Sequence, residues 1–125
     1  MRALVLDDSR AVRSIIGGIL RDLGMEVYQA ANGREGLEQL RRAPAIELML
    51  VDWNMPEMNG LDFIRAVRAQ PAFQGARILM VTSEAESDHV TQALDAGANE
   101  YLMKPFTKEI LVAKLNLLDV YQDQE

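Results

Sequence analysis

The sequence contains no cysteine and a single histidine among its 125 residues. Without cysteine there is no disulfide framework, no thiol nucleophile and no cysteine-based zinc site. One histidine excludes a histidine-rich metal site, and a Ser/His/Asp arrangement could be built only on His89. We expect the His89 side chain to be solvated and to take no part in chemistry.

The sequence also lacks long hydrophobic runs and an excess of basic residues. No stretch approaches the roughly 20 apolar residues of a membrane span, and the apolar run at 3–6 is too short for a signal peptide. The formal net charge of -6 argues against direct nucleic-acid binding, which depends on basic patches. We therefore expect a cytoplasmic protein that binds neither membrane nor nucleic acid directly. A cation or a basic partner fits its charge better.

One stretch, residues 48–56, combines a buried strand with a polar turn. Four apolar residues are followed by Asp52, and a proline and then Asn59-Gly60 come after it. A short apolar run bounded by turn signals is typical of a strand that is buried on both faces. In an open α/β sheet, ligands bind at the carboxyl ends of the strands. Asp52 therefore lies where chemistry is expected.

The rest of the chain alternates between short apolar runs and segments with helical periodicity. Strands are expected at 3–6, 26–30, 48–51, 77–81 and 101–103. Helices are expected after Ser9, over 35–42, around 61–67, from about Ser87 to Gly97, and after Thr107. Such alternation predicts a single α/β domain over residues 1–125, with a doubly wound parallel sheet and helices on both faces. The strand at 26–30 is the less apolar one and is expected near an edge.

The periodicity also predicts which helical residues face the core. They are Val12, Ile15, Ile16, Ile19, Leu20 and Leu23, then Leu37 and Leu40, then Leu61, Ile64 and Val67, then Val90, Ala93 and Leu94, and finally Leu111, Leu115 and Leu118. Arg65 and Arg68 are expected to point outward. Residues 71–75 are expected to form a loop.

Polar residues able to do chemistry follow four of the strands. They are Asp7 and Asp8, Asp52, Thr82 and Lys104. In a parallel sheet these strand ends share one edge, so we expect the side chains to converge. Two carboxylates about 4 Å apart repel by roughly 4 kcal/mol at an effective dielectric near 20. Either their pKa values rise or a cation lies among them.

The donor set at this edge favours Mg²⁺, because all its ligands are hard oxygens. Lys104 and Mg²⁺ could offset the charge of a phosphate, and Thr82 could donate a hydrogen bond to it. The residues alone therefore indicate Mg²⁺-assisted phosphoryl transfer to Asp52. Simpler interpretations stay open: Asp7 and Asp8 as acids at a helix start, Asp52 as a turn residue, Thr82 as a cap and Lys104 as a solvated lysine.

Motifs along nearly the whole chain resemble those of the receiver domains of two-component response regulators. The motifs are Asp7-Asp8, Val51-Asp52-Trp53-Asn54-Met55-Pro56, Met58-Asn59-Gly60-Leu61, Met80-Val81-Thr82, Gly97-Ala98, Tyr101, and Lys104-Pro105-Phe106-Thr107. The chain is most similar to the stand-alone chemotaxis members, the CheY-like group. The resemblance implies the flavodoxin-like strand order 2-1-3-4-5.

The resemblance also implies a phosphorylated aspartate and a metal site. Asp52 would accept a phosphoryl group from the phosphohistidine of a histidine kinase or a phosphotransfer protein. Asp8, Asp52 and the backbone carbonyl of Asn54 would bind Mg²⁺ directly, and Asp7 would act through a water molecule. Asn54 and Glu84 would tune the rate of self-dephosphorylation.

Three further residues take on roles through the resemblance. Lys104 would pair with the phosphoryl group, and the Lys104–Pro105 bond would be cis. Thr82 would move toward the phosphoryl group, while Tyr101 would swing inward as the switch aromatic; a static, half-buried tyrosine is the alternative. Ser83 stands where the family usually has alanine, and it could slow the switch.

The implied output is a change in protein binding through the face of the fourth helix, fifth strand and fifth helix. A monomer is expected, with dimerisation on activation left open. The acidic stretch 86–89, where the chemotaxis protein carries lysines, argues against a shared flagellar-motor target. We expect no turnover of a free substrate.

Three alternatives to a phosphorylated receiver are open. A phosphatase with an aspartyl-phosphate intermediate usually has a second acid two residues after its nucleophile, where this chain has Asn54. A degenerate receiver would act by protein contacts alone. A flavodoxin-like cofactor binder would have to place its phosphate against Asp7 and Asp8, which would repel it.

Overall fold

The computed structural model describes residues 1–43, 45–83 and 88–121. Within these residues, five parallel strands form one sheet in the order β2-β1-β3-β4-β5. The strands are β1 (Arg2–Leu6), β2 (Glu26–Ala30), β3 (Leu48–Asp52), β4 (Arg77–Ser83) and β5 (Glu100–Lys104). The expected parallel sheet and the strand order implied by the resemblance are both confirmed. The strand expected near an edge, β2, is an edge strand.

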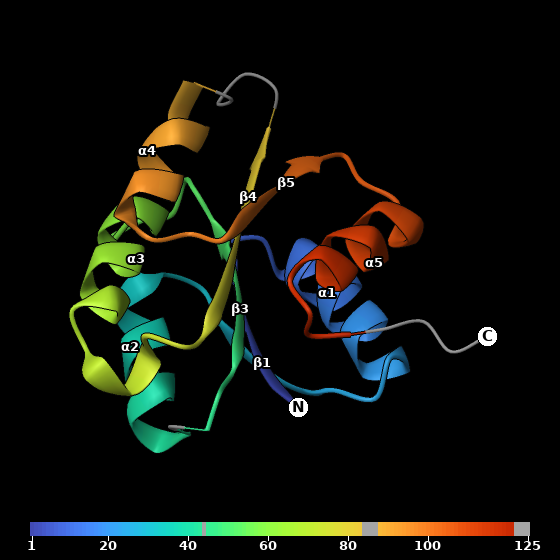
Figure 1. Cartoon of the computed structure of the whole chain (residues 1–125), viewed down its shortest axis with the longest axis horizontal. Coiled ribbons are helices and arrows are strands. Elements are labelled where there is room, and N and C mark those ends of the chain that lie inside the picture. The colour runs from blue at the N-terminus through green and yellow to red at the C-terminus, as the bar shows by residue number, and fades with distance from the viewer. Residues whose placement is uncertain (44, 84–87, 122–125) are drawn as a thin grey trace.

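Helices cover both faces of the sheet (Figure 1). They are α1 (Arg10–Asp22), α2 (Gly33–Arg42), α3 (Gly60–Arg68), α4 (Val90–Ala96) and α5 (Lys108–Leu117), with a short 3₁₀ turn η1 (Pro71–Phe73). Figure 1 shows α2, α3 and α4 on one face and α1 and α5 on the other. The expected loop at 71–75 therefore contains a helical turn, which begins at a proline whose fixed φ suits a first helical position.

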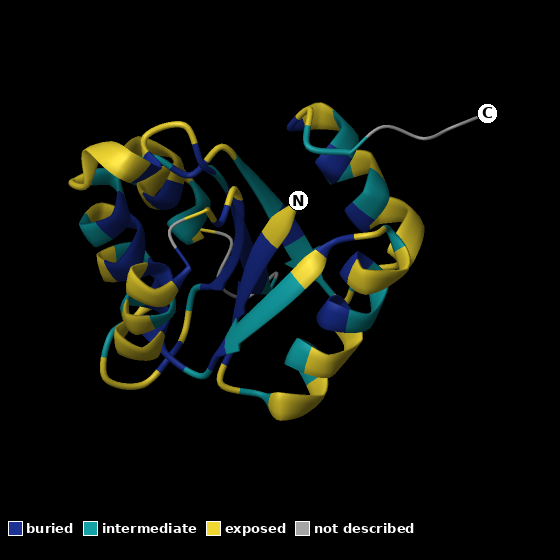
Figure 2. Ribbon diagram, turned by 90° about the horizontal axis from the view of Figure 1, so that it is seen from below, coloured by how far each residue is buried: buried dark blue, intermediate teal, exposed yellow. Residues whose placement is uncertain are grey.

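Alternate residues of the strands fill two separate cores. In β3, Met49 and Val51 pack with the core beneath α2, α3 and α4, while Leu48 and Leu50 pack with the core beneath α1 and α5. Because both faces are covered, every residue of β3 is buried (Figure 2). This double burial is why the strand has an unbroken apolar run rather than an alternating one.

The predicted start and stop signals of the helices are present. The Ser9 hydroxyl accepts a hydrogen bond from the Val12 N–H at 3.3 Å, and Thr107 does the same for Ile110 at 3.2 Å. Each side chain satisfies a backbone donor that the first helical turn leaves free. Gly97, expected to end a helix, has φ 121° directly after α4, where an L side chain would be strained.

Two residues expected in the core are exposed instead. Ile15 is 59% exposed and Leu94 is 41% exposed. In each case the neighbouring residue, Ile16 or Ala93, occupies the centre of the buried face, and a step of one residue turns the side chain about 100° around the helix. Conversely, Phe63 of α3 was not among the predicted core residues, yet it is fully buried in the core on the side of the sheet covered by α2, α3 and α4.

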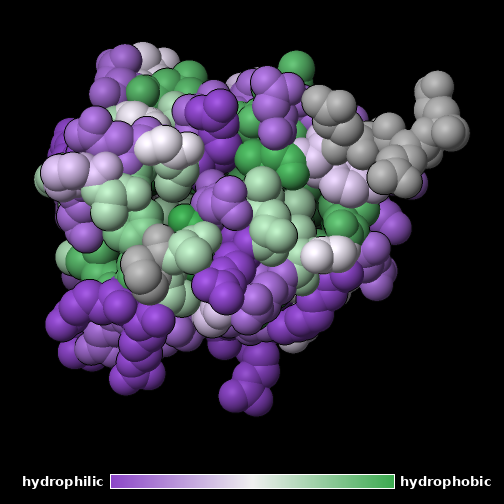
Figure 3. Space-filling model, turned by 60° about the horizontal axis from the view of Figure 1, so that its bottom comes forward, coloured by the Kyte–Doolittle hydropathy of each residue, from purple (hydrophilic) through white to green (hydrophobic). Residues whose placement is uncertain are grey.

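Arg68 does not point outward as predicted. Its guanidinium donates to the carbonyls of Phe73 (2.7 Å), Gln74 (3.2 Å) and Gly97 (2.9 Å) and to Asn99 Oδ1 (2.9 Å). A guanidinium presents five N–H donors, so one half-buried side chain connects α3, η1, the end of α4 and the start of β5. These contacts lie near the start of β5, at the amino ends of the strands. Figure 3 is turned so that this end of the molecule comes forward, and it shows apolar areas bordered by hydrophilic side chains.

Two expected helix boundaries fall on residues outside the described part of the chain: Ser87, near the start of the helix that ends at Gly97, and Pro44, which was expected to close the helix over 35–42. Within the described part, α4 begins at Val90, and α2 ends at Arg42 with Ala43 as its C-cap. In that same part of the structure, no helix is long and apolar enough to cross a membrane.

Candidate functional site

The carboxyl ends of β1, β3 and β5 bring acidic and basic side chains together. Asp7 follows β1, Asp52 ends β3 and Lys104 ends β5. Asp7 and Asp52 are 1% and 4% exposed, whereas Asp8 is exposed. Among the described residues, Asp7, Asp8 and Asp52 form a group in which one carboxylate oxygen of each lies within 4.8 Å of those of the other two. Their convergence is what the positions of the strand ends predicted.

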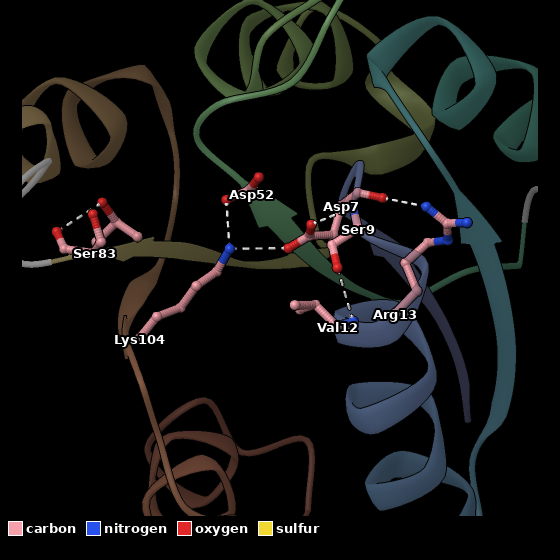
Figure 4. A network of polar contacts seen from close by, with 8 residues as sticks. Asp7, Ser9, Val12, Arg13, Asp52, Ser83 and Lys104 are labelled. Carbon is pink, nitrogen blue, oxygen red and sulfur yellow. Dashed lines mark hydrogen bonds and ion pairs between the residues drawn. The ribbon is translucent and has the colours of Figure 1, made fainter.

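Lys104 lies between the two buried carboxylates. Its Nζ is 3.1 Å from Asp7 Oδ2 and 3.1 Å from Asp52 Oδ1, and Figure 4 shows the ammonium group between them. Hydrogen bonds between ionised groups are stronger than neutral ones, and more so away from water. The ammonium therefore offsets part of the repulsion between Asp7 and Asp52.

The first turn of α1 fixes Asp7 from the other side. The Ser9 N–H donates to Asp7 Oδ1 at 2.9 Å, and Arg13 Nη1 donates to the Asp7 carbonyl at 2.6 Å. Both oxygens of the Asp7 carboxylate thus have protein partners. Ser9 was expected to precede the first helix but was not expected to contact Asp7; the spacing of two residues, typical of an Asx turn, was the available signal. Nothing in the sequence pointed to Arg13.

The environment perturbs the pKa values of both charged partners. Burial raises the pKa of Asp52 to about 6, the negative charge of Asp7 adds to the increase, and Lys104 opposes it. Burial on its own would lower the pKa of Lys104, but the charge of Asp52 and the hydrogen bonds with Asp7 and Asp52 raise it overall. At neutral pH, Lys104 is therefore a cation and Asp52 is mostly ionised.

The turn after β3 returns closely on the strand end. The Trp53 N–H donates to the Val81 carbonyl at 3.1 Å, and the Gly60 N–H donates to the Trp53 carbonyl at 3.0 Å. A Cβ at Gly60 would overlap the Asp52 carbonyl oxygen, so only glycine fits. Asn54 is exposed within this turn, two residues after Asp52.

The two predicted switch residues are found on β4 and β5. Thr82 is fully buried, and its hydroxyl donates to the Ser83 carbonyl at 3.4 Å. Tyr101 is half-buried, and Lys114 Nζ lies 4.1 Å from the centre of its ring. Lys114 also forms an ion pair with Glu100 at 3.2 Å. The Tyr101 ring thus packs against a cation anchored on α5, a contact that the sequence did not indicate.

His89 is not solvated as predicted. It is half-buried, and its ring stacks on Trp53 with the ring centres 4.2 Å apart and the planes 19° apart. Its Nδ1 atom is buried and has no hydrogen-bond partner among the residues that the structure describes. The contact joins residues that are far apart in the sequence, so local patterns could not predict it.

Two predicted site features remain, the Lys104–Pro105 peptide bond and Glu84. The Lys104–Pro105 peptide bond is cis, the isomer implied by the resemblance. Glu84, expected to tune dephosphorylation, lies outside the described residues.

The acidic cluster fits a small divalent cation. It offers hard carboxylate oxygens, which Mg²⁺ prefers. Asp8 faces solvent, so an ion could enter without disturbing the core. Burial is the main cause of the raised pKa of Asp52, and the negative charges of Asp7 and Asp8 add to it. A cation among these carboxylates would offset their mutual repulsion.

Comparisons with known proteins agree with this geometry. The sequence profile of the response regulator receiver domain matches residues 3–116. The chain is 44% identical over 119 residues to the chemotaxis protein CheY1 of Helicobacter pylori (strain J99), covering 94% of this chain and 96% of the relative. It is 40% identical to the chemotaxis protein CheY of Pseudomonas aeruginosa, covering 92% and 93% of the two chains.

Solved structures show the same similarity in three dimensions. The chemotaxis response regulator CheY4 of Vibrio cholerae superposes with a TM-score of 0.87 at 36% identity, covering 94% of this chain and 97% of that one. The similarity therefore includes the strand ends that carry the candidate site.

Proposed function

The chain belongs to the response regulator receiver family, and from this premise we propose that it is a phosphorylation-switched signalling module with Asp52 as its phosphoacceptor. One observation carries the proposal. The Lys104 ammonium lies 3.1 Å from both Asp7 and Asp52, inside a cluster of carboxylates at the carboxyl edge of the sheet. Such a cluster concentrates negative charge around a buried nucleophile and supplies one cation beside it.

In the proposed reaction, a phosphohistidine of a histidine kinase or phosphotransfer protein is the donor. A carboxylate oxygen of Asp52 attacks phosphorus, the nitrogen–phosphorus bond breaks, and its electron pair stays on the imidazole. Asp52 must be ionised to attack, and with a pKa of about 6 it is mostly ionised at pH 7. Lys104 offsets the negative charge that the phosphoryl oxygens bring.

The residues that would hold Mg²⁺ are Asp8, Asp52 and the backbone carbonyl of Asn54. Asp7 would act through a water molecule, because its oxygens already accept hydrogen bonds from the Ser9 N–H and Lys104. When bound, the ion supplies positive charge that stabilises the transferring phosphoryl group. Asn54 and Glu84 would set the lifetime of the phosphorylated state.

The proposed output is a change in protein binding rather than turnover of a free substrate. Thr82 and Tyr101 would form the two-state element that responds to phosphorylation. The responding surface would be the face of α4, β5 and α5, where Tyr101 and Lys114 lie. We also propose a cytoplasmic location, because that is where a kinase would deliver the phosphoryl group to this module.

The decisive experiment is intact-mass spectrometry after incubation with acetyl phosphate, with and without Mg²⁺. We expect one phosphoryl group on the wild-type chain only when Mg²⁺ is present. The Asp52→Asn variant should gain none, while the control Asp62→Asn, which removes an exposed acid from α3, should be labelled like wild type. Labelling of Asp52→Asn, or no labelling of wild type, would contradict the proposal; the latter result would favour a receiver that acts by protein contacts alone.

A further inference from the structure

The turn after β3 is bound to the start of α2 by a part-buried hydrogen bond between a buried Asn32 and an exposed Glu57. Asn32 Nδ2 donates to Glu57 Oε2 at 2.9 Å, and Asn32 is only 4% exposed. Beside it, the Gly33 N–H donates to the Met58 carbonyl at 3.2 Å. A Cβ on Gly33 would come within 2.7 Å of the Met58 side chain, so the two segments are in direct contact.

Glu57 adopts a backbone conformation that is unusual for its residue type. Its φ is 63°, in the left-handed region that residues with a Cβ rarely adopt. Such conformations persist where the surrounding contacts determine them, and they are frequent near functional sites. The contact to Asn32 is one such constraint, and an exposed ion pair with Arg34 at 3.6 Å is a weaker one.

The hydrogen bond joins the two segments that carry the site. On one side, Asn32 follows β2, whose last carbonyl, at Ala30, accepts a hydrogen bond from the Asp7 N–H at 3.2 Å. On the other side, Glu57 lies in the turn that begins after Asp52 and contains Asn54. The Asn32–Glu57 bond therefore holds the segment next to Asp7 against the turn that carries Asn54.

We propose that Glu57 is a positioning residue that sets the affinity of the site for Mg²⁺ by holding the Asn54 turn in place through Asn32. A metal whose ligands come from separate segments binds best when those segments are held together beforehand. Glu57 itself does not contact the ion. The inference rests on the proposed function, which assigns Mg²⁺ to Asp8, Asp52 and the Asn54 carbonyl.

Exchanging the donor and the acceptor separates this role from general stability. Asn32 Oδ1 also accepts the Glu35 N–H at 2.9 Å as the cap of α2, and Asn32→Asp keeps that acceptor but turns a carboxylate toward Glu57. Glu57→Gln on its own keeps an oxygen that can accept from Asn32. The double variant Asn32→Asp/Glu57→Gln restores one donor and one acceptor in exchanged positions.

The measurement is a Mg²⁺ titration that follows the fluorescence of Trp53, the only tryptophan, which is adjacent to Asp52. The gain in unfolding midpoint on adding Mg²⁺ is an independent second readout. We expect Asn32→Asp and Glu57→Ala to weaken Mg²⁺ binding by about tenfold, the size typical of changes at residues that hold metal ligands in place without contacting the ion. Glu57→Gln and the double variant should bind close to wild type. Arg34→Gln, which removes only the exposed ion pair, is the matched control and should also bind like wild type.

Urea unfolding without metal distinguishes positioning from folding. If Glu57→Ala binds Mg²⁺ as wild type does, whatever its stability, the inference is overturned. It is also overturned if the double variant binds as weakly as Asn32→Asp. If wild type itself binds no Mg²⁺, the proposed function fails and the inference fails with it, so the two failures are distinguishable.

Discussion

Replacing Asp52 with asparagine should make the metal-free protein more stable. Asp52 is 4% exposed and lies beside another buried carboxylate, Asp7. Its ionised form is therefore more costly in the folded protein than in the unfolded chain. Asparagine has nearly the same shape but carries no charge, so the substitution removes that cost and keeps a polar group that can pair with Lys104.

The size of the effect follows from the pKa. The Asp52 pKa rises from 3.8 to about 6 on folding, and one pH unit of difference corresponds to 1.36 kcal/mol, so the ionised carboxylate costs at most about 3 kcal/mol. Because the folded state holds the proton more tightly, this cost is absent below about pH 4. It grows as the pH rises from about 4 to about 6 and is constant above that range.

The test is urea denaturation of wild type and Asp52→Asn in EDTA across this pH range. At pH 7 we expect the variant to be more stable by about 1–3 kcal/mol, with the advantage vanishing near pH 4. The control Asp62→Asn should change the free energy of unfolding by less than about 0.5 kcal/mol. Adding Mg²⁺ should stabilise wild type and have less effect on Asp52→Asn. A variant that is less stable than wild type at pH 7 would refute the reasoning.

Three further substitutions test other parts of the structure. Phe63→Ala removes a fully buried ring and should lower the free energy of unfolding by about 3–5 kcal/mol in urea denaturation; a loss well under that range would mean that the core collapses around the space. Gly60→Ala places a methyl group against the Asp52 carbonyl, so we expect a loss of about 1–3 kcal/mol together with slower labelling by acetyl phosphate. His89→Ala removes the ring stacked on Trp53 and should change Trp53 emission while costing no more than about 1.5 kcal/mol. An unchanged emission spectrum would show that the stack does not persist in solution.

The sheet could be predicted from the sequence because burial on both faces leaves an unambiguous signal. In β3, every residue is buried, so the apolar run is unbroken and ends at Asp52. The hydrophobic pattern of a helix is a weaker signal, because adjacent residues point about 100° apart around the helix axis. When two neighbours are both apolar, the pattern does not decide which one is buried. Ile15 and Ile16 are both apolar, and only packing decides that Ile16 is buried while Ile15 is exposed.

The sequence was enough to predict which residues lie together at the candidate site, because they follow the ends of parallel strands. It was not enough to predict the side-chain contacts around them. The topology of the parallel sheet places Asp7, Asp52 and Lys104 at one edge, independently of the conformations of their side chains. The Asn32–Glu57 bond and the Trp53–His89 stack join residues that no local pattern relates. They arise from the way the turns pack against one another, which depends on the complete fold.

The four hydrogen bonds of Arg68 give the short helix α4 two unequal ends. At its C-terminal end, the Gly97 carbonyl is held by a charged guanidinium that also binds η1 and Asn99. At its N-terminal end, α4 is preceded by its N-cap residue His89, whose ring stacks on Trp53 next to Asp52. A ring stack is weaker than a set of charge-assisted hydrogen bonds. If the segment around Trp53 shifts, α4 would therefore rotate about its C-terminal end at Gly97. The largest displacement would then occur at its N-terminal end, close to Asp52.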